Sequence, residues 1–260
     1  MTNSIDKLNT VGKAILIFQT ITEANRPLSV KEIADAAGLN KSSLHHHIKT
    51  LAELGYLQQD QETRKYDIGL GLVQVGQSYL QRLDVRSRGH AYLEELSYEL
   101  NVTTYMLVLD QDHVLYVDKV DIPHPEGSLK CSSFIGMRTD VYSTACGKVL
   151  LSKLDTEVFE RVLDKIQIQA ITPHTLPSID ALRAEIVLTR QRGYGLDLEE
   201  HSLGLQCVAV PIYDMNGHCI AAISVSSPVT SFTREALEGE LREKLEATGQ
   251  KISLAMGYKP

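Results

Sequence analysis

The chain has 260 residues, 43% of them hydrophobic, which is enough for one large or two smaller domains with substantial cores. No run of about 18 apolar residues and no secretory signal is found, so we expect neither a membrane span nor export. The formal net charge of −7 does not exclude nucleic-acid binding, because residues 1–69 carry eight basic and eight acidic side chains and the whole excess of acid lies beyond them.

Three short helices are predicted in the N-terminal segment. Apolar residues follow helical spacing over 11–23, and the run 25–27 ends this helix. A capping box of Ser29 and Glu32 begins the second helix, and Gly38 ends it. Asn40 is a good N-cap for a third helix, which Gly55 follows. The apolar stripe of the third helix comprises Leu44, Ile48, Leu51 and Leu54.

A small β-hairpin is predicted directly after these helices. Residues 56–59 and 66–70 have the pattern of short strands, and the polar run 60–65 has the pattern of a turn. Three helices followed by a hairpin form a winged helix-turn-helix domain, which we expect over residues 1–70.

A linker helix is predicted next, over residues 71–83, and residues 84–260 form the second domain. This domain begins with an amphipathic helix over 85–100 and then mixes strands and helices without a regular βαβ alternation. Strands are predicted over 103–110, 113–121, 128–135, 206–213 and 218–226, and helices over 144–154, 156–166, 179–192 and 233–256. The fold class predicted for the chain is therefore α+β, with an antiparallel sheet flanked by helices in the second domain.

The outward face of the third helix carries polar side chains that can reach base edges and phosphates. In helix-turn-helix proteins the second helix of the motif enters the major groove of double-stranded DNA. The candidate DNA-binding residues are Lys41, Ser42, Ser43, His45, His46 and Lys49 on the helix, with Arg64 and Lys65 on the wing. The alternative is a surface helix of a small helical bundle. Three consecutive histidines on a helix point in different directions, so no metal site is expected at His45, His46 and His47.

Five segments resemble motifs of the IclR family of transcription regulators. Residues 38–45 resemble the recognition helix of that family, and residues 142–151, 192–201, 204–212 and 221–226 resemble its later motifs in the same order. The resemblance covers essentially the whole chain and lies nearest to the sugar-acid (KdgR-like) subgroup. His46 departs from the pattern, because relatives usually carry arginine there, so a family operator sequence does not transfer directly.

The resemblance implies a GAF-like effector-binding domain over residues 84–260, a homodimer or tetramer, and a palindromic DNA operator. A helix that begins near Ala145 would direct the backbone N–H groups of Ala145 and Cys146 towards a carboxylate. By the resemblance, the other effector-binding residues are Asp197, Cys207, Ser224 and Ser226, with Leu205 and Met137 as apolar walls. The residues alone also allow Asp197 as a turn cap, Cys207 as a core residue and the two serines as surface residues.

The expected function is sequence-specific regulation, most simply repression, of a carbohydrate or sugar-acid catabolic operon under the control of a small carboxylate. One alternative is a thiol-redox regulator that uses Cys146, because a helix N-terminus lowers the pKa of a thiol. Asp197, His201 and Cys207 could also be taken for a nucleophile set, but Cys207 lies in a predicted buried strand, and we expect no enzyme. No cofactor is expected. The four cysteines lie far apart, without a Cys-x-x-Cys pair, as in a reduced, cytoplasmic protein.

Overall fold

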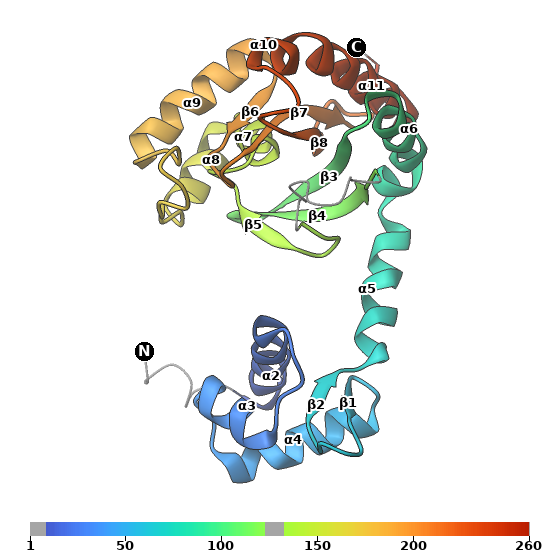
Figure 1. The fold of residues 1–260 in the computed structure, drawn as a ribbon, viewed down its shortest axis with the longest axis vertical. Coiled ribbons are helices and arrows are strands. Elements are labelled where there is room, and N and C mark those ends of the chain that lie inside the picture. The colour runs from blue at the N-terminus through green and yellow to red at the C-terminus, as the bar shows by residue number, and fades with distance from the viewer. Residues whose placement is uncertain (1–8, 123–132, 260) are drawn as a thin grey trace. The chain divides into compact units, whose positions relative to one another are not determined.

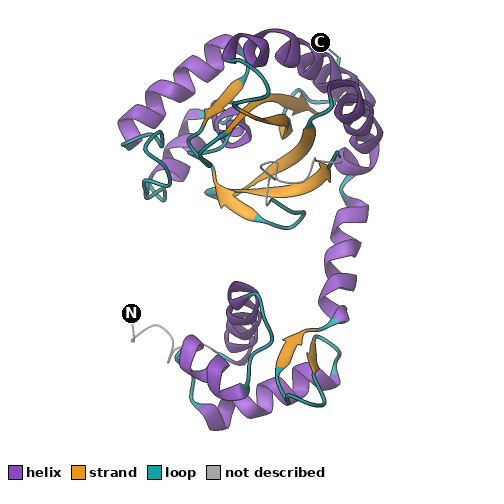
Figure 2. Ribbon diagram, viewed as in Figure 1, coloured by secondary structure: helices purple, strands orange, loops and turns teal. Residues whose placement is uncertain are grey.

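The computed structural model describes residues 9–122 and 133–259. The chain divides into two units, one ending at Arg82 and the other beginning at Leu83. Figures 1 and 2 show a small, mainly helical first unit and a second unit in which helices surround a β-sheet. The predicted α+β class is therefore confirmed. No helix within the described ranges is both long and apolar enough to cross a membrane.

The first unit has the predicted helices and hairpin. Its elements are α2 (Thr10–Ala24), α3 (Val30–Ala37), α4 (Lys41–Glu53), β1 (Leu57–Gln59), β2 (Tyr66–Ile68) and α5 (Leu70–Arg82). The capping box is present: Ser29 accepts a hydrogen bond from the Glu32 backbone, and the Glu32 carboxylate accepts one from the Ser29 backbone. Asn25 and Gly38 end α2 and α3 in the left-handed conformation, with φ of 49° and 64°.

An apolar core holds the three helices and the hairpin together. Its buried members include Ile17, Ile33, Leu44 and Ile48, which come from α2, α3 and α4. The hairpin is fixed to this core, because Leu28 and Tyr66 exchange two backbone hydrogen bonds of 2.9 and 2.7 Å. Burial of one face of α4 in this way leaves its opposite face to solvent.

The sheet of the second unit is antiparallel throughout and has the strand order β5-β4-β3-β8-β7-β6. Its strands are β3 (Thr103–Asp110), β4 (His113–Val120), β5 (Arg138–Asp140), β6 (Gly195–Leu198), β7 (Leu205–Tyr213) and β8 (Cys219–Pro228). Strands β3 and β8 are central, although more than 100 residues separate them in the sequence. This pairing brings distant parts of the chain onto one face of the sheet.

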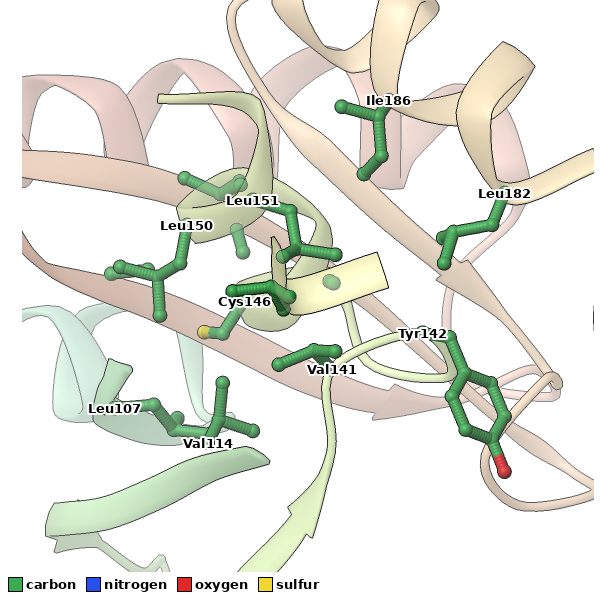
Figure 3. Packing of buried hydrophobic residues seen from close by; sticks show 14 of the residues in the cluster. Leu107, Val114, Val141, Tyr142, Cys146, Leu150, Leu151, Leu182 and Ile186 are labelled. Atoms are coloured by element: carbon green, nitrogen blue, oxygen red, sulfur yellow. The ribbon is translucent and has the colours of Figure 1, made fainter. Parts of the chain in front are cut away.

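Helices cover both faces of this sheet. Helices α6 (Asp84–Leu100) and α11 (Arg242–Ala255) pack on one face, and α7 (Ala145–Ser152) packs on the other. Two further helices, α8 (Thr156–Leu163) and α9 (Ile179–Arg192), complete the layer around α7. Figure 3 shows the cluster of buried side chains in that layer, with Leu150 and Leu151 of α7, Leu107 of β3 and Leu182 of α9.

The structure differs from the predicted elements of the second unit in three places. The strand expected over 128–135 is absent from its described part, because the chain turns at Gly136 (φ 93°) and β5 begins at Arg138. Residues 128–132 lie outside the described ranges. Strand β6 was not predicted, because its four residues are too few to show a period. The final helix is interrupted, since a π-helical turn, η1 (Leu237–Leu241), separates α10 (Arg234–Ala236) from α11.

Candidate functional sites

Helix α4 presents a polar, exposed face opposite its buried stripe. Lys41, His45, His46 and Lys49 are exposed, whereas Leu44 and Ile48 are buried in the core of the first unit. Lys49 lies 3.8 Å from Glu53 in a solvent-exposed pair, which leaves its ammonium group free to exchange partners. The side chains of Ser42 and Ser43 lie outside the described part of the structure, although their backbone belongs to α4. The described residues therefore form a face of the kind that enters a major groove.

The wing adds basic side chains beside this helix. Arg64 is exposed at the turn and has a left-handed backbone, with φ of 57°. Asp60 organises the turn by accepting hydrogen bonds from the backbone of Glu62 and Thr63. Lys65 is half-buried and lies 3.8 Å from Glu32 of α3, so it is directed in part towards the protein.

His47 differs from the two histidines before it. Its side chain is half-buried, and burial together with the nearby Lys13 lowers its pKa, which favours the neutral form. The rings of His46 and His47 are 6.0 Å apart and tilted by 56°. Among the described residues, no group of three or more histidine, cysteine or carboxylate side chains is placed to hold a metal ion.

A cavity of about 210 Å³ lies in the second unit between α7 and the sheet. Of the eight residues expected to bind an effector, seven line it. The expectation for Met137 was wrong: it packs against the cluster of buried apolar residues around α7 and does not line the cavity. The seven are Ala145, Cys146, Asp197, Leu205, Cys207, Ser224 and Ser226. The fold therefore brings together residues that lie up to 81 positions apart in the chain.

Strand register explains why these residues converge. Asp197 of β6 is directly opposite Cys207 of β7, and Cys207 is opposite Ser226 of β8. Residues directly opposite one another in a sheet project to the same face, so these three side chains form one row. In this row Cys207 Sγ and Ser226 Oγ are 2.8 Å apart. Ser224 shares the face two residues before Ser226 and is opposite Tyr105 of β3.

The N-terminus of α7 forms the facing wall of the cavity. Thr144 caps the helix by accepting a hydrogen bond from the Gly147 backbone at 3.2 Å. Gly195 allows β6 to approach this turn, because a Cβ atom on it would lie 2.4 Å from the Ala145 carbonyl oxygen. The first N–H groups of a helix have no carbonyl partner within it, so those of Ala145 and Cys146 are suited to an anionic oxygen.

A buried ion pair supports the acidic side of the cavity. The Lys148 ammonium group is buried and donates hydrogen bonds to the Leu196 carbonyl oxygen, at 2.8 Å, and to Glu200 Oε1. Asp197 Oδ1 accepts hydrogen bonds from the backbone of Glu200, at 2.8 Å, and of His201, at 3.3 Å. Burial raises the pKa of Asp197 to about 7, and the Glu200 carboxylate adds to this while Lys148 opposes it.

The structure removes the physical basis of the redox alternative. Cys146 does lie in the first turn of α7, but it is 2% exposed, and Figure 3 shows it within the apolar cluster. Burial raises the pKa of its thiol to about 12, so the thiolate that reacts with oxidants is not formed at neutral pH. The expectation of a lowered pKa at Cys146 was wrong, because desolvation outweighs the helix N-terminus.

The three residues that could be taken for a nucleophile set have other roles in the structure. His201 Nδ1 lies 3.2 Å from Ser143 Oγ, and burial lowers the pKa of His201. Asp197 binds two backbone N–H groups, and Cys207 binds Ser226. These contacts position groups around a cavity rather than activate a nucleophile.

Several cavity residues were missed by sequence reasoning. The further lining residues are Tyr105, Leu107, Tyr116, Ser133, Thr144, His201 and Ser202. Tyr105 and Leu107 alternate on β3 and share a face, a signal that the sequence does contain. The sequence does not reveal that β3 pairs with β8, so nothing connects Tyr105 to the serines before the fold is known.

Family models match both units of the chain. The IclR helix-turn-helix domain matches residues 10–61, and the bacterial transcriptional regulator IclR C-terminal domain matches residues 77–254. Three relatives from Escherichia coli (strain K12) align over 253 residues. They are the transcriptional regulator XynR (36% identical; 96% of this chain, 98% of the relative), the regulator KdgR (34%; 97% and 94%) and the transcriptional repressor IclR (31%; 96% and 91%).

Solved structures show the same architecture. The crystal structure of the Thermotoga maritima IclR is 31% identical, covers 96% of this chain and 99% of its own, and has a TM-score of 0.76. An IclR homologue from Microbacterium hydrocarbonoxydans, solved in complex with 4-hydroxybenzoate, has a TM-score of 0.81 at 20% identity and covers 95% of this chain and 99% of its own. At that identity the second comparison is one of fold alone.

Proposed function

Because the chain belongs to the IclR family of DNA-binding transcriptional regulators, we propose that it represses a carbohydrate or sugar-acid catabolic operon under the control of a small carboxylate effector. It is a regulator and not an enzyme. The relatives reported above are likewise named as transcriptional regulators. The sugar-acid pathway is proposed from the likeness to XynR and KdgR, and repression from the likeness to the repressor IclR. We place the protein in the cytoplasm, where its DNA target lies.

The effector proposal rests on the cavity between α7 and the sheet. It combines a helix N-terminus, which favours a carboxylate, with a row of hydroxyl, thiol and carboxyl groups that can bind hydroxyl or keto oxygens. Its volume of about 210 Å³ suits a small molecule. Ala145 and Cys146 would bind the carboxylate, Asp197, Cys207, Ser224 and Ser226 the other oxygens, and Leu205 the apolar part. A carboxylate, 4-hydroxybenzoate, is bound by the Microbacterium homologue.

The exposed polar face of α4 supports a specific mode of DNA binding. We propose that α4 enters a major groove, where Lys49 contacts a phosphate and the other candidate residues of the helix reach base edges: Lys41, Ser42, Ser43, His45 and His46. Arg64 and Lys65 on the wing would bind the backbone or the minor groove. A homodimer or tetramer would present two such helices to a palindromic operator. Effector binding would then shift the population between states that differ in affinity for DNA.

Two measurements test this proposal. Selection of genomic DNA fragments by the purified protein should enrich a palindromic sequence near carbohydrate or sugar-acid genes, and binding should weaken steeply as salt rises. Thermal unfolding in the presence of gluconate, lactate, pyruvate or 4-hydroxybenzoate should show stabilisation by at least one of them. The proposal fails if no sequence-selective DNA binding is found, and its effector part fails if none of the four acids stabilises the protein.

A further inference from the structure

The cavity contains more negative than positive charge once an effector carboxylate enters it. Among residues 9–122 and 133–259, no lysine or arginine lines the cavity. The nearest buried cation is Lys148, and its ammonium group already donates hydrogen bonds to Glu200 and to the Leu196 carbonyl oxygen. An ionised effector would therefore share a buried space with Asp197 and with the Glu200 carboxylate behind it, and like charges in a medium of low dielectric constant repel strongly.

The two oxygens of Asp197 differ in their surroundings. Oδ1 accepts the backbone N–H groups of Glu200 and His201, which fixes the carboxyl plane. Among the described residues no hydrogen bond reaches Oδ2, and the side chain lines the cavity while being 4% exposed. A proton on Oδ2 would leave both bonds at Oδ1 intact and would give the cavity an O–H donor.

We propose that this regulator binds its effector together with one proton, which is carried by Asp197 Oδ2 and donated in a hydrogen bond to a hydroxyl or keto oxygen of a monocarboxylate. The inference rests on the effector site proposed above and specifies its chemistry. The carboxylate of the effector lies at the N-terminus of α7, and the protonated Asp197 lies across the cavity from it. The complex then contains one negative charge fewer than it would if the effector carboxylate and Asp197 were both ionised.

Other groups near Asp197 do not compete for this proton. Lys148 is held by Glu200, and burial keeps the His201 ring and the Cys146 thiol in their neutral forms at pH 7 by lowering and raising their pKa values, respectively. Burial also raises the pKa of Glu200, but Lys148 opposes that rise and Glu200 is not among the residues that line the cavity. The titratable or charged groups that face Asp197 or line its cavity are Cys146 and Lys148 from α7, Glu200 and His201 after β6, Cys207 from β7, and Tyr105 and Tyr116 from β3 and β4.

The free protein is poised to take up the proton near neutral pH. Because burial raises the pKa of Asp197 to about 7, this group is protonated below that pH and ionised above it. An anion in the cavity raises the pKa further, so binding above pH 7 requires proton uptake and binding below pH 7 does not. Effector affinity should be constant below about pH 7 and should fall by up to about tenfold per pH unit above it.

The test is isothermal titration calorimetry of the full-length protein with gluconate, lactate, pyruvate and 4-hydroxybenzoate, from about pH 6 to about pH 9. The carboxyl groups of these acids stay ionised over this range. At about pH 8, titrations in buffers of different ionisation enthalpy should count about one proton taken up for each acid bound. The Asp197→Asn variant should bind with a pH-independent dissociation constant, whereas the control Asp180→Asn, at an exposed position on α9, should keep the wild-type pH dependence.

The outcomes separate this inference from the effector proposal. If an acid binds with the same affinity at every pH and without proton uptake, the effector proposal stands and the proton coupling is refuted. If Asp197→Asn weakens binding but keeps the wild-type slope, Asp197 has only a structural role and the inference is also refuted. If none of the four acids binds at any pH, both proposals fail. The proton count uses only the wild-type protein, so it decides the matter even if the Asn variant does not fold.

Discussion

Lys148 and Glu200 form an ion pair in the interior of the second unit, where their side chains are 1% and 10% exposed. The pair connects α7 to the segment after β6, and the backbone N–H of Glu200 in turn holds Asp197. Glu200 Oε2 is buried and has no hydrogen-bond partner among the described residues, so the carboxylate depends on Lys148 for its compensation. This relationship fixes the acidic wall of the cavity.

Removal of one member of this pair should be strongly destabilising. Lys148→Met keeps the length of the side chain but leaves the Glu200 carboxylate buried and unpaired, which costs about 3–5 kcal/mol. The free energy of unfolding can be measured in urea by far-UV circular dichroism. Arg183→Met is the matched control, because the Arg183–Glu160 pair is 41% and 43% exposed and such pairs contribute about 0–1 kcal/mol. Equal losses in the two variants would contradict the role assigned to the buried pair.

The stability of the second unit should depend on the ionisation of Asp197. Its pKa is about 7 in the folded protein and 3.8 in the reference state, so folding is opposed progressively as pH rises from about 4 to about 7. Asp197→Asn keeps an oxygen acceptor for the two N–H groups and removes this titration. The free energy of unfolding of the variant should exceed that of the wild type by an amount that grows over that pH range to at most about 4 kcal/mol and then stays constant. If the free energies of unfolding in urea change with pH in the same way for the two proteins, the pKa of Asp197 is not raised in the folded state.

Lys49 should contribute to DNA affinity without contributing to sequence preference. Lys49→Ala removes one phosphate contact per protomer, so the slope of log affinity against log salt should become shallower by about one for each protomer bound. Lys251→Ala is the control, since Lys251 is 54% exposed on α11, far along the chain from α4. Fluorescence anisotropy over a salt series measures both variants. An unchanged slope for Lys49→Ala would exclude a phosphate contact at this position.

Helix α5 should be required for high operator affinity. Val75 is 56% exposed, so Val75→Pro breaks the helix at a cost of about 3 kcal/mol without disturbing a core. Operator affinity should fall on the order of tenfold or more. Gly76→Ala is the neighbouring control: no atom lies within 4 Å of its added Cβ, and the change favours the helix by about 0.5–1 kcal/mol. Wild-type affinity in the proline variant would argue against a linking role for α5.

Local signals in the sequence predicted most of the fold. The Ser29–Glu32 capping box and the helix ends at Asn25 and Gly38 depend on neighbouring residues, and the structure has all of them. Strand β6 was missed because it is too short to show a period. The π-helical turn was missed because its buried residues, Leu237 and Leu241, are four apart in the sequence, as in an ordinary α-helix.

The site could be predicted from motifs but not from physical reasoning on the residues alone. Asp197, Cys207 and Ser226 meet because β6, β7 and β8 pair in one register, and such long-range pairing is not encoded in any local window. The same limit explains why the predictions for Met137 and for the Cys146 thiol were wrong. Nothing near either residue in the sequence shows that Met137 does not line the cavity or that the Cys146 side chain is buried.

We propose that occupation of the cavity controls DNA binding by the first unit. The most direct measurement is fluorescence anisotropy of the protein on its selected operator, titrated with whichever of the four acids stabilises it against heat. We expect this acid to release the protein from DNA. Ser224→Ala combined with Ser226→Ala should raise the acid concentration required by about tenfold, while Ser231→Ala, at an exposed position, should not. Tight acid binding that leaves operator affinity unchanged would contradict it.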